Sequence, residues 1–206
     1  MTYEFKEGQT PIDESERAGL KVKVITTQQE LDRLEQRNIE QALRWMIGRK
    51  IPAEEILTEQ FIKALHRRMF KDVWKWAGQF RRTDKNIGVR WYEVPIATRQ
   101  LCEDARFWVA HGTYPAKELA IRFKHRLVSI HCFPNGNGRH SRLMADVLIT
   151  GAFGLPAFGW RGSRLVRADE QRNAYIQSLR QADQGNLVPL LTFALGEPYR
   201  PTESPP

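Results

Sequence analysis

The sequence has 206 residues and a net charge of +8, from 32 Lys and Arg against 24 Asp and Glu, and 41% of its residues are apolar. This length predicts one domain with room for a small extension, and the apolar fraction excludes a wholly disordered chain. The longest apolar-leaning stretch, residues 147–160, is too short and too interrupted by Gly and Pro to span a membrane. The first residues lack the pattern of a signal peptide, and Cys102 and Cys132 make neither a disulfide framework nor a zinc set. We therefore expect a cytoplasmic protein.

The positive charge is polarised along the chain. Residues 1–60 hold nine basic and 12 acidic residues, whereas residues 61–90 hold nine basic and two acidic ones. A basic stretch of this kind is typical of a surface that meets nucleic acid, a membrane or a phosphorylated ligand, and a solvated face is the alternative. As a hypothesis, the acidic start could fold over the basic middle and restrain it.

The hydrophobic periodicity between two polar ends is mostly helical. Thr27 and Glu30 have the spacing of a capping box, so a helix is predicted to begin there and to end near Gly48. Apolar residues at i, i+4, i+8 and i+11 mark 116–131 as a core-facing helix. Further helices are predicted from residue 52 or 53 through Met69, and over 96–111, 138–151, 167–182 and 187–195. The first 20 and last ten residues are rich in turn-formers and are read as loops.

Only one segment reads as extended. Residues 83–95 place β-branched and aromatic residues around the turn-former Asn86-Ile87-Gly88. One such segment is too small to build a sheet, so it is predicted to form a hairpin on a helical body. The fold class is therefore all-α, a helical bundle with a small β-hairpin flap.

The segment that carries chemistry is residues 131–142, which read His-Cys-Phe-Pro-Asn-Gly-Asn-Gly-Arg-His-Ser-Arg. Pro134 and the run Gly136-Asn137-Gly138 cannot continue a helix, so the chain turns sharply between two helices. Two glycines around an asparagine let successive backbone N–H groups point into one concavity. At a helix N-terminus such a concavity is an anion site.

Two arginines and a histidine flank this concavity. Arg139 and Arg142 fall at i, i+3 in the first turns of the helix, where a cation is unfavourable by about 0.3–1 kcal/mol because of the helix dipole. A bound anion would offset that cost, and guanidinium groups suit forked contacts to phosphate oxygens. His131 could take a proton from an attacking hydroxyl, because imidazole titrates near neutral pH. Asn135 offers an amide oxygen to a cation or to a phosphate-bound water.

Other candidate groups have plainer interpretations. A Walker loop is excluded because Arg139-His140 stands where Lys-Ser/Thr is required. The remaining histidines are expected to be structural or exposed, and Cys132 lacks a base beside it that would make it a nucleophile. The cations on or beside the flap form a solvated face or dock an acidic target, namely Arg81, Arg82, Lys85 and Arg90.

The 131–142 motif resembles the signature of the Fic (Fic/Doc) family, His-x-Phe-x-Asp/Glu-Gly-Asn-Gly-Arg-x-x-Arg. Residues 65–70 and 76–81 look like the family's first core helix and its exit into the flap, and residues 175–185 are similar to its closing helix. Together these segments cover about residues 54–195. Residues 34–39 resemble the branch called mobile mystery protein B.

The resemblance implies a Fic-type helical bundle that transfers AMP from ATP to a hydroxyl side chain of a target protein. It implies His131 as general base, with the target segment docked on the flap at residues 83–95. It also implies nucleotide-binding roles for the rest of the loop, namely Asn135, Gly136, Asn137, Gly138, Arg139 and Arg142, of which Arg139 also stabilises the leaving pyrophosphate. Residues 1–53 are then an N-terminal extension with a regulatory role, 54–195 the Fic domain and 196–206 a flexible tail.

Two departures from the family pattern leave alternatives open. Asn135 stands where the family usually has the Asp or Glu that binds Mg²⁺, and a neutral amide is a weaker ligand for this ion. Transfer of UMP, GMP, phosphocholine or phosphate is therefore an alternative, as is a low-activity nucleotide-binding, regulatory or nucleic-acid-binding module. The family's inhibitory helix, Ser/Thr-x-x-x-Glu-Gly/Asn, has no full match. Inhibition is then either degenerate or supplied by an antitoxin-like partner, which fits a toxin-antitoxin setting. Binding to nucleic acid or to a membrane is not expected.

Overall fold

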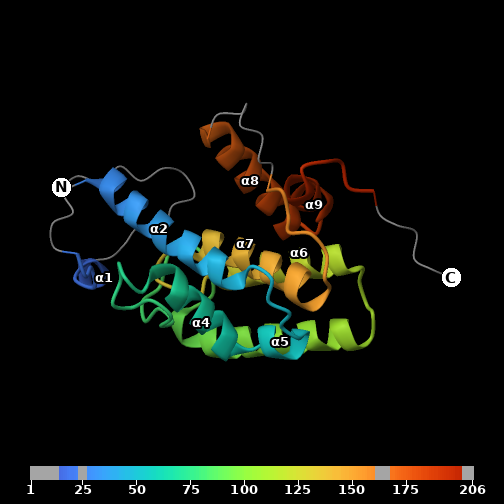
Figure 1. Cartoon of the computed structure of the whole chain (residues 1–206), viewed down its shortest axis with the longest axis horizontal. Helices are drawn as coiled ribbons and strands as arrows, with labels where there is room; N and C mark the ends of the chain where they lie inside the picture. The colour runs from blue at the N-terminus through green and yellow to red at the C-terminus, as the bar shows by residue number, and fades with distance from the viewer. Residues whose placement is uncertain (1–13, 23–26, 161–167, 201–206) are drawn as a thin grey trace.

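The computed structural model describes residues 14–22, 27–160 and 168–200, and these residues are mostly helical (Figure 1). Of the loops predicted over the first 20 and last ten residues, 1–13 and 201–206 lie outside this range, and the first prediction is wrong at Glu14–Arg17, which forms a short helix. The elements in chain order are α1 (Glu14–Arg17), α2 (Gln28–Met46), α3 (Ala53–Ile56), α4 (Glu59–Phe70), a 3-10 turn (Trp91–Glu93), α5 (Val94–Ala110), α6 (Ala116–Ile130), α7 (Asn137–Val147), a π-helical turn (Leu148–Ala152), α8 (Ala168–Asp183) and α9 (Val188–Leu195).

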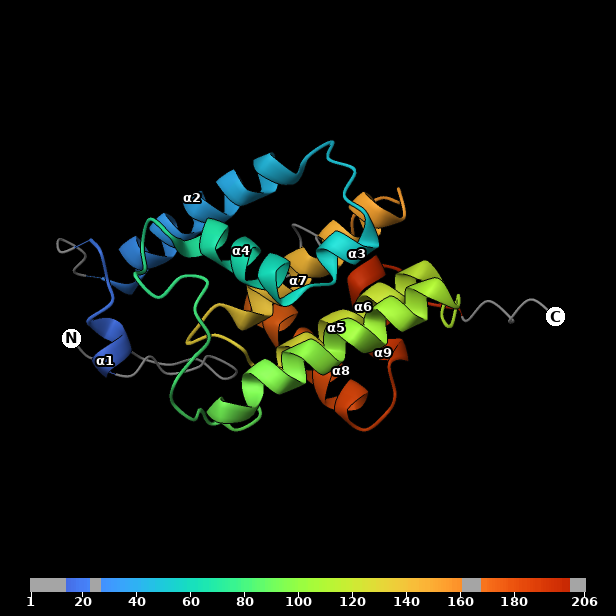
Figure 2. The same cartoon turned by 90° about the horizontal axis from the view of Figure 1, so that it is seen from below.

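Helices α6 and α7 form the centre of the bundle. α6 packs against α5 on one side and against α7 and α9 on others, while α4 contacts both α7 and α2 (Figure 2). The predicted core stripe of α6 is confirmed, because Leu119, Phe123, Leu127 and Ile130 are all buried. The all-α fold class is therefore confirmed, and the loop between α6 and α7 lies where several helices meet.

Local sequence signals set several helix ends. Thr27 Oγ1 accepts a hydrogen bond from Glu30 N at 3.2 Å, and Glu30 Oε2 accepts one from Thr27 N at 3.0 Å, so the predicted capping box is confirmed. The helix predicted from residue 52 or 53 through Met69 is instead two helices. Thr58 Oγ1 accepts from Phe61 N at 3.1 Å and caps α4, which separates it from the single turn of α3.

The predicted hairpin over residues 83–95 is not seen. Within the described residues the sole isolated β-bridge joins Leu20 to Trp74, and the flap segment, here residues 83–93, carries no strand. The carbonyls of Thr83 and Val89, which a hairpin could pair across its strands, both accept hydrogen bonds from Arg81. Val94 then begins α5 with Pro95 in its first turn, a position that proline favours.

One acidic residue of the N-terminal part, Glu16, contacts the basic middle, while the hypothesised restraint stays a prediction. Helix α1 lies beside the flap segment in both views (Figures 1 and 2), where Lys85 Nζ lies 2.6 Å from Glu16 Oε2. Across the described parts of the chain, no helix is long and apolar enough to cross a membrane.

Candidate functional site

The motif loop, residues 131–136, connects α6 to α7. Two residues in the left-handed region make its turns, His131 with φ of 59° and Gly136 with φ of 79°. Gly136 must be glycine, because an added Cβ would lie 2.5 Å from Phe70 Cζ. Among the described residues no side chain caps the N-terminus of α7. Its first backbone N–H groups therefore remain suited to an anion, as the sequence predicts.

The side chain of Asn137 holds the loop in shape. Its Oδ1 accepts from Phe133 N at 2.9 Å, and its Nδ2 donates to Phe133 O at 2.8 Å. Both polar ends of the amide are thereby used inside the protein. Asn137 can therefore serve an anion site through its backbone N–H, while its side chain orders the loop.

His66 supports the loop from α4. Its Nδ1 accepts from Gly78 N at 3.0 Å, so its Nε2 carries the hydrogen that is donated to Asn135 O at 3.1 Å. Its ring also stacks on Phe133, with 3.7 Å between ring centres. Burial, helped by His140, holds the pKa of His66 well below its usual range. The expected structural role is confirmed, and it is specific: His66 ties residue 78 to the motif loop.

His131 is almost enclosed, with 4% of its surface exposed. Burial lowers the pKa of its imidazole to about 4, and the positive charge of Arg81 adds to the effect. The ring is therefore neutral at pH 7 and can accept a proton. Gly88 of the flap segment lies against it, since a Cβ added there would be 2.6 Å from His131 Cβ.

Arg81 is buried and donates to several backbone carbonyls. The sequence predicted only a cation on or beside the flap. It is 2% exposed, and its guanidinium donates to the carbonyls of His131 (2.6 Å) and Thr83 (2.9 Å), and to that of Val89. It thus joins the flap segment to the residue proposed as the base. The adjoining position behaves differently, because Arg82 is exposed.

Arg139 is paired with an acidic residue from the N-terminal part. Its Nη2 lies 2.7 Å from Glu35 Oε2, and its guanidinium lies 5.1 Å from the centre of the Phe70 ring. Glu35 is buried in α2, and its other carboxylate oxygen accepts from Trp74 Nε1 at 2.6 Å. The sequence contained a signal for this residue, since Glu35 interrupts the side of α2 that also carries Leu31 and Asn38.

Arg142 is directed to a different neighbour. Its Nε donates to Gly138 O at 3.3 Å, and its guanidinium lies 5.2 Å from the centre of the Tyr175 ring on α8. The amine of Lys124 is buried 4.4 Å from the same ring centre, where burial and Arg142 hold its pKa well below the usual range. The two motif arginines start on one side of α7, but Arg139 reaches α2 and Arg142 reaches α8.

The metal prediction at Asn135 finds little support in the surrounding donors. Its Oδ1 accepts from Gly136 N at 2.5 Å. The described residues hold no group of three or more His, Cys, Asp or Glu side chains that could bind a metal ion. A single neutral amide oxygen that already accepts from the backbone is a weak ligand for Mg²⁺, so the metal role of Asn135 stays a prediction. An ion here would have to arrive with the phosphates of a nucleotide.

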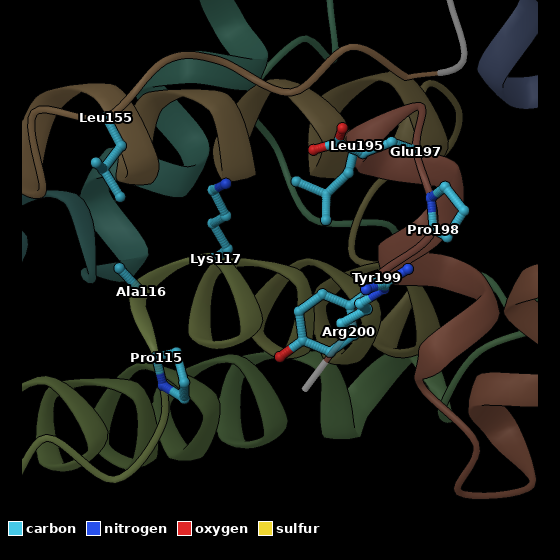
Figure 3. A pocket seen from close by; sticks show the side chains of 9 residues that line it. All are labelled: Pro115, Ala116, Lys117, Leu155, Leu195, Glu197, Pro198, Tyr199 and Arg200. Carbon is cyan, nitrogen blue, oxygen red and sulfur yellow. The ribbon is translucent and has the colours of Figure 1, made fainter. Parts of the chain in front are cut away.

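A hollow of about 340 Å³ lies away from the motif, near the C-terminal end of the described chain (Figure 3). Leu155 and Leu195 line it from one side, and Tyr199 and Arg200 contribute from the segment after α9. No residue of 131–142 lines this hollow. It therefore adds nothing to the candidate site.

Comparison with known proteins finds similarity to Fic proteins. Residues 56–149 match the family model described as Fic/DOC family. The chain is 30% identical over 142 residues to a protein adenylyltransferase Fic of Drosophila grimshawi, a match that covers 66% of the chain and 28% of that relative. The chain thus spans less than a third of this relative's length.

Solved Fic structures share the fold. The N-terminal Fic domain of a Bartonella effector protein from Bartonella sp. AR 15-3 superposes with a TM-score of 0.66 at 15% identity, covering 85% of this chain and 84% of that one. BepC from Bartonella tribocorum, solved with bound AMPPNP, gives a TM-score of 0.64 at 15% identity, covering 93% of this chain and all of that one. The Fic-domain fold is therefore confirmed.

Proposed function

Because residues 56–149 carry a Fic/DOC family domain, we propose that the protein is a protein adenylyltransferase that transfers AMP from ATP to a hydroxyl side chain of a target protein. One observation carries the proposal. His131 is buried and neutral, and one short loop joins it to the N-terminus of α7. Two arginines follow in the first turns of α7. That set supplies a base, an anion cradle and charge stabilisation within 12 residues.

The chain's own groups divide the work as follows. His131 takes the proton of the target hydroxyl as its oxygen attacks the α-phosphorus of ATP, and pyrophosphate leaves. Backbone N–H groups at the start of α7 hold phosphate oxygens, helped by the helix dipole. Arg139 and Arg142 stabilise the negative charge that develops on the leaving group. No step is assigned to a metal ion here; Asn135 would hold one only together with the phosphates of the nucleotide.

The target segment is proposed to dock along the flap segment. Exposed apolar side chains gather there and at the start of α5, namely Ile87, Trp91, Tyr92 and Ile96. An extended target segment would pair with the flap segment between its two anchored ends, since the carbonyls of Thr83 and Val89 already accept from Arg81. Gly88 against His131 would bring such a segment close to the base.

The contact between Glu35 and Arg139 supports a restrained ground state. While Arg139 is neutralised by Glu35, it cannot bind phosphate oxygens with its full charge. This restraint lies within the chain and is an alternative to the antitoxin-like partner. ATP would then compete with the carboxylate of Glu35 for Arg139.

The test is label transfer. We would incubate the protein with ATP labelled at the α-phosphate and, separately, at the γ-phosphate, together with a cell lysate. The Glu35→Gln and His131→Asn variants would be treated in the same way. The expected result is incorporation of the α-label alone, stronger for Glu35→Gln and lost for His131→Asn. Incorporation of the γ-label alone would assign phosphate transfer instead, and α-label incorporation independent of His131 would contradict the mechanism.

A further inference from the structure

A second cationic site lies outside the motif, where the chain after α4 meets the segment after α1. A hollow of about 390 Å³ opens there, lined by Arg67, Lys71, Lys75 and Lys21 with one carboxylate, Asp72. We name it the basic hollow. It accounts for much of the positive charge of residues 61–90 that the motif does not use.

Of the six other cations of that stretch, Arg82 is exposed and Arg68 lies 3.8 Å from the centre of the Trp45 ring. The other four have polar partners. Lys63 pairs with Glu59 at 2.7 Å and Lys85 with Glu16 at 2.6 Å, while Arg90 pairs with Asp84 at 3.0 Å. Arg81 is buried among carbonyl oxygens. By contrast, the ion pairs found within the described residues include none for the four cations of the basic hollow.

The backbone brings these cations together. Lys21 N donates to Val73 O at 2.9 Å and Lys75 N donates to Gly19 O at 2.8 Å, which pairs the two segments around the bridge from Leu20 to Trp74. Lys21 Nζ then reaches Lys71 O at 2.6 Å. The C-terminal dipole of α4 favours cations at 67 and 71, but it does not account for Lys75. Four exposed cationic residues therefore line one hollow, where a bound anion would reduce their mutual repulsion.

The lining selects the chemistry of the ligand. Trp74 is 1% exposed, so it offers no open ring face on which a base or an apolar group could stack. The charged groups of the lining are four cations and one carboxylate, and ammonium and guanidinium donors suit phosphate oxygens. The volume falls in the range typical of small-molecule sites, about 300–1,000 Å³. We propose that the basic hollow binds a compact polyphosphate anion, recognised by charge.

This proposal does not depend on the adenylyltransferase activity, so its test measures binding. Inorganic triphosphate would be titrated by calorimetry into the Arg142→Ala variant. This substitution weakens the competing anion site of the motif. Lys71→Gln with Lys75→Gln would be added to this background. The matched control is Lys50→Gln with Lys117→Gln, which removes the same charge from exposed positions outside the basic hollow.

We expect triphosphate to bind about tenfold more weakly when Lys71 and Lys75 are replaced, and nearly unchanged for the control pair. Equal losses for the two pairs, or no loss for either, would overturn the proposal. A short DNA duplex provides a second arm at the same salt concentration. If the duplex binds more tightly than triphosphate through the same lysines, the occupant is a nucleic-acid backbone and the compact-anion proposal is wrong. Circular dichroism of each variant confirms that the fold is retained.

Discussion

Glu35 on α2 and Arg139 on α7 meet at 2.7 Å, with the carboxylate side chain 5% exposed and the arginine side chain 33% exposed. Trp74 donates to the other carboxylate oxygen, so Glu35 is held in one orientation. This pair places an acidic group from the N-terminal part on an arginine of the motif. The N-terminal part therefore contributes a residue to the candidate site.

Replacing Glu35 with Gln should raise nucleotide binding. Glutamine keeps an oxygen for Trp74 but removes the negative charge, so Arg139 becomes free to meet phosphate. We expect ATP affinity and AMP transfer to rise by about tenfold, within the usual range of coupling free energies. Calorimetry with ATP and α-label transfer would measure the two effects. Glu40→Gln, an exposed change on the same helix, is the control. An equal effect of the two variants would contradict the restraint.

Replacing Arg81 with Met should destabilise the protein. The carbonyls of His131, Thr83 and Val89 would lose their donor inside the protein. Since a buried acceptor left without a partner costs about 1–3 kcal/mol, the free energy of unfolding should fall by about 3 kcal/mol. Urea denaturation measures it. Arg82→Met, the adjacent exposed position, should change stability by less than about 0.5 kcal/mol. Similar losses for both variants would mean that the hydrogen bonds of Arg81 do not stabilise the fold.

Gly88→Ala should impair the flap segment. The added methyl would lie 2.6 Å from His131 Cβ and 2.9 Å from Ile130 O, at a φ of +100° that disfavours alanine. We expect a loss of about 1–3 kcal/mol in the free energy of unfolding, together with a drop in activity as the base is displaced. Gly112→Ala has φ of +58° and nothing within 4 Å, so it isolates the cost of the backbone conformation. If the two alanines cost the same, close approach to His131 contributes nothing.

His131 should make stability depend on pH in a defined window. Its pKa falls from an unfolded value of 6.5 to about 4 in the fold, chiefly through burial. Between these values the unfolded chain binds more protons than the folded one. Stability therefore falls as the pH drops from 6.5 towards 4, and this contribution levels off below 4. The free energy of unfolding should fall by about 2 kcal/mol less between pH 7 and pH 5 in a His131→Asn variant.

Asparagine suits this test because it tolerates the left-handed backbone of residue 131 better than most residues do. Denaturant unfolding of both proteins at pH 7 and pH 5 gives the comparison. The other buried histidines are unchanged in the variant, so they cancel in the difference. Identical pH dependence in the two proteins would show that His131 is not held neutral by burial. A pH dependence of the rate with its acidic limb near pH 6.5 would also conflict with the lowered pKa of His131.

Asn135→Asp should lower the Mg²⁺ concentration that the reaction requires. The carboxylate would add a charged oxygen ligand where an amide oxygen now accepts from Gly136 N. We expect half-maximal activity at about tenfold lower Mg²⁺ concentration, because the ion would then be held by protein and nucleotide together. A titration of label transfer with Mg²⁺ measures the shift. Asn86→Asp, an exposed change of equal charge in the flap segment, is the control. If Asn135→Asp does not shift the Mg²⁺ concentration for half-maximal activity, position 135 does not take part in metal binding.

The sequence by itself predicted most of the helices and the sharp turn of the motif loop. Both depend on local signals: the apolar stripe of α6, the capping box at Thr27 and the glycines around Asn137. Because these signals act over a few residues, the stripe and the capping box predicted α2 and α6 to within about two residues, as local patterns commonly do. The helix that breaks at Thr58 was missed, since the apolar spacing continues across the cap.

Only the tertiary structure decided which charges meet. Glu35 meets Arg139, Glu16 meets Lys85, and Arg81 turns inward to carbonyls of the flap segment and the motif loop. Periodicity does not encode such pairs, because partners far apart in sequence are chosen by how helices pack and by which groups burial leaves without water. The cations behind the net charge of +8 therefore include some used within the fold, some at the motif and some in the basic hollow.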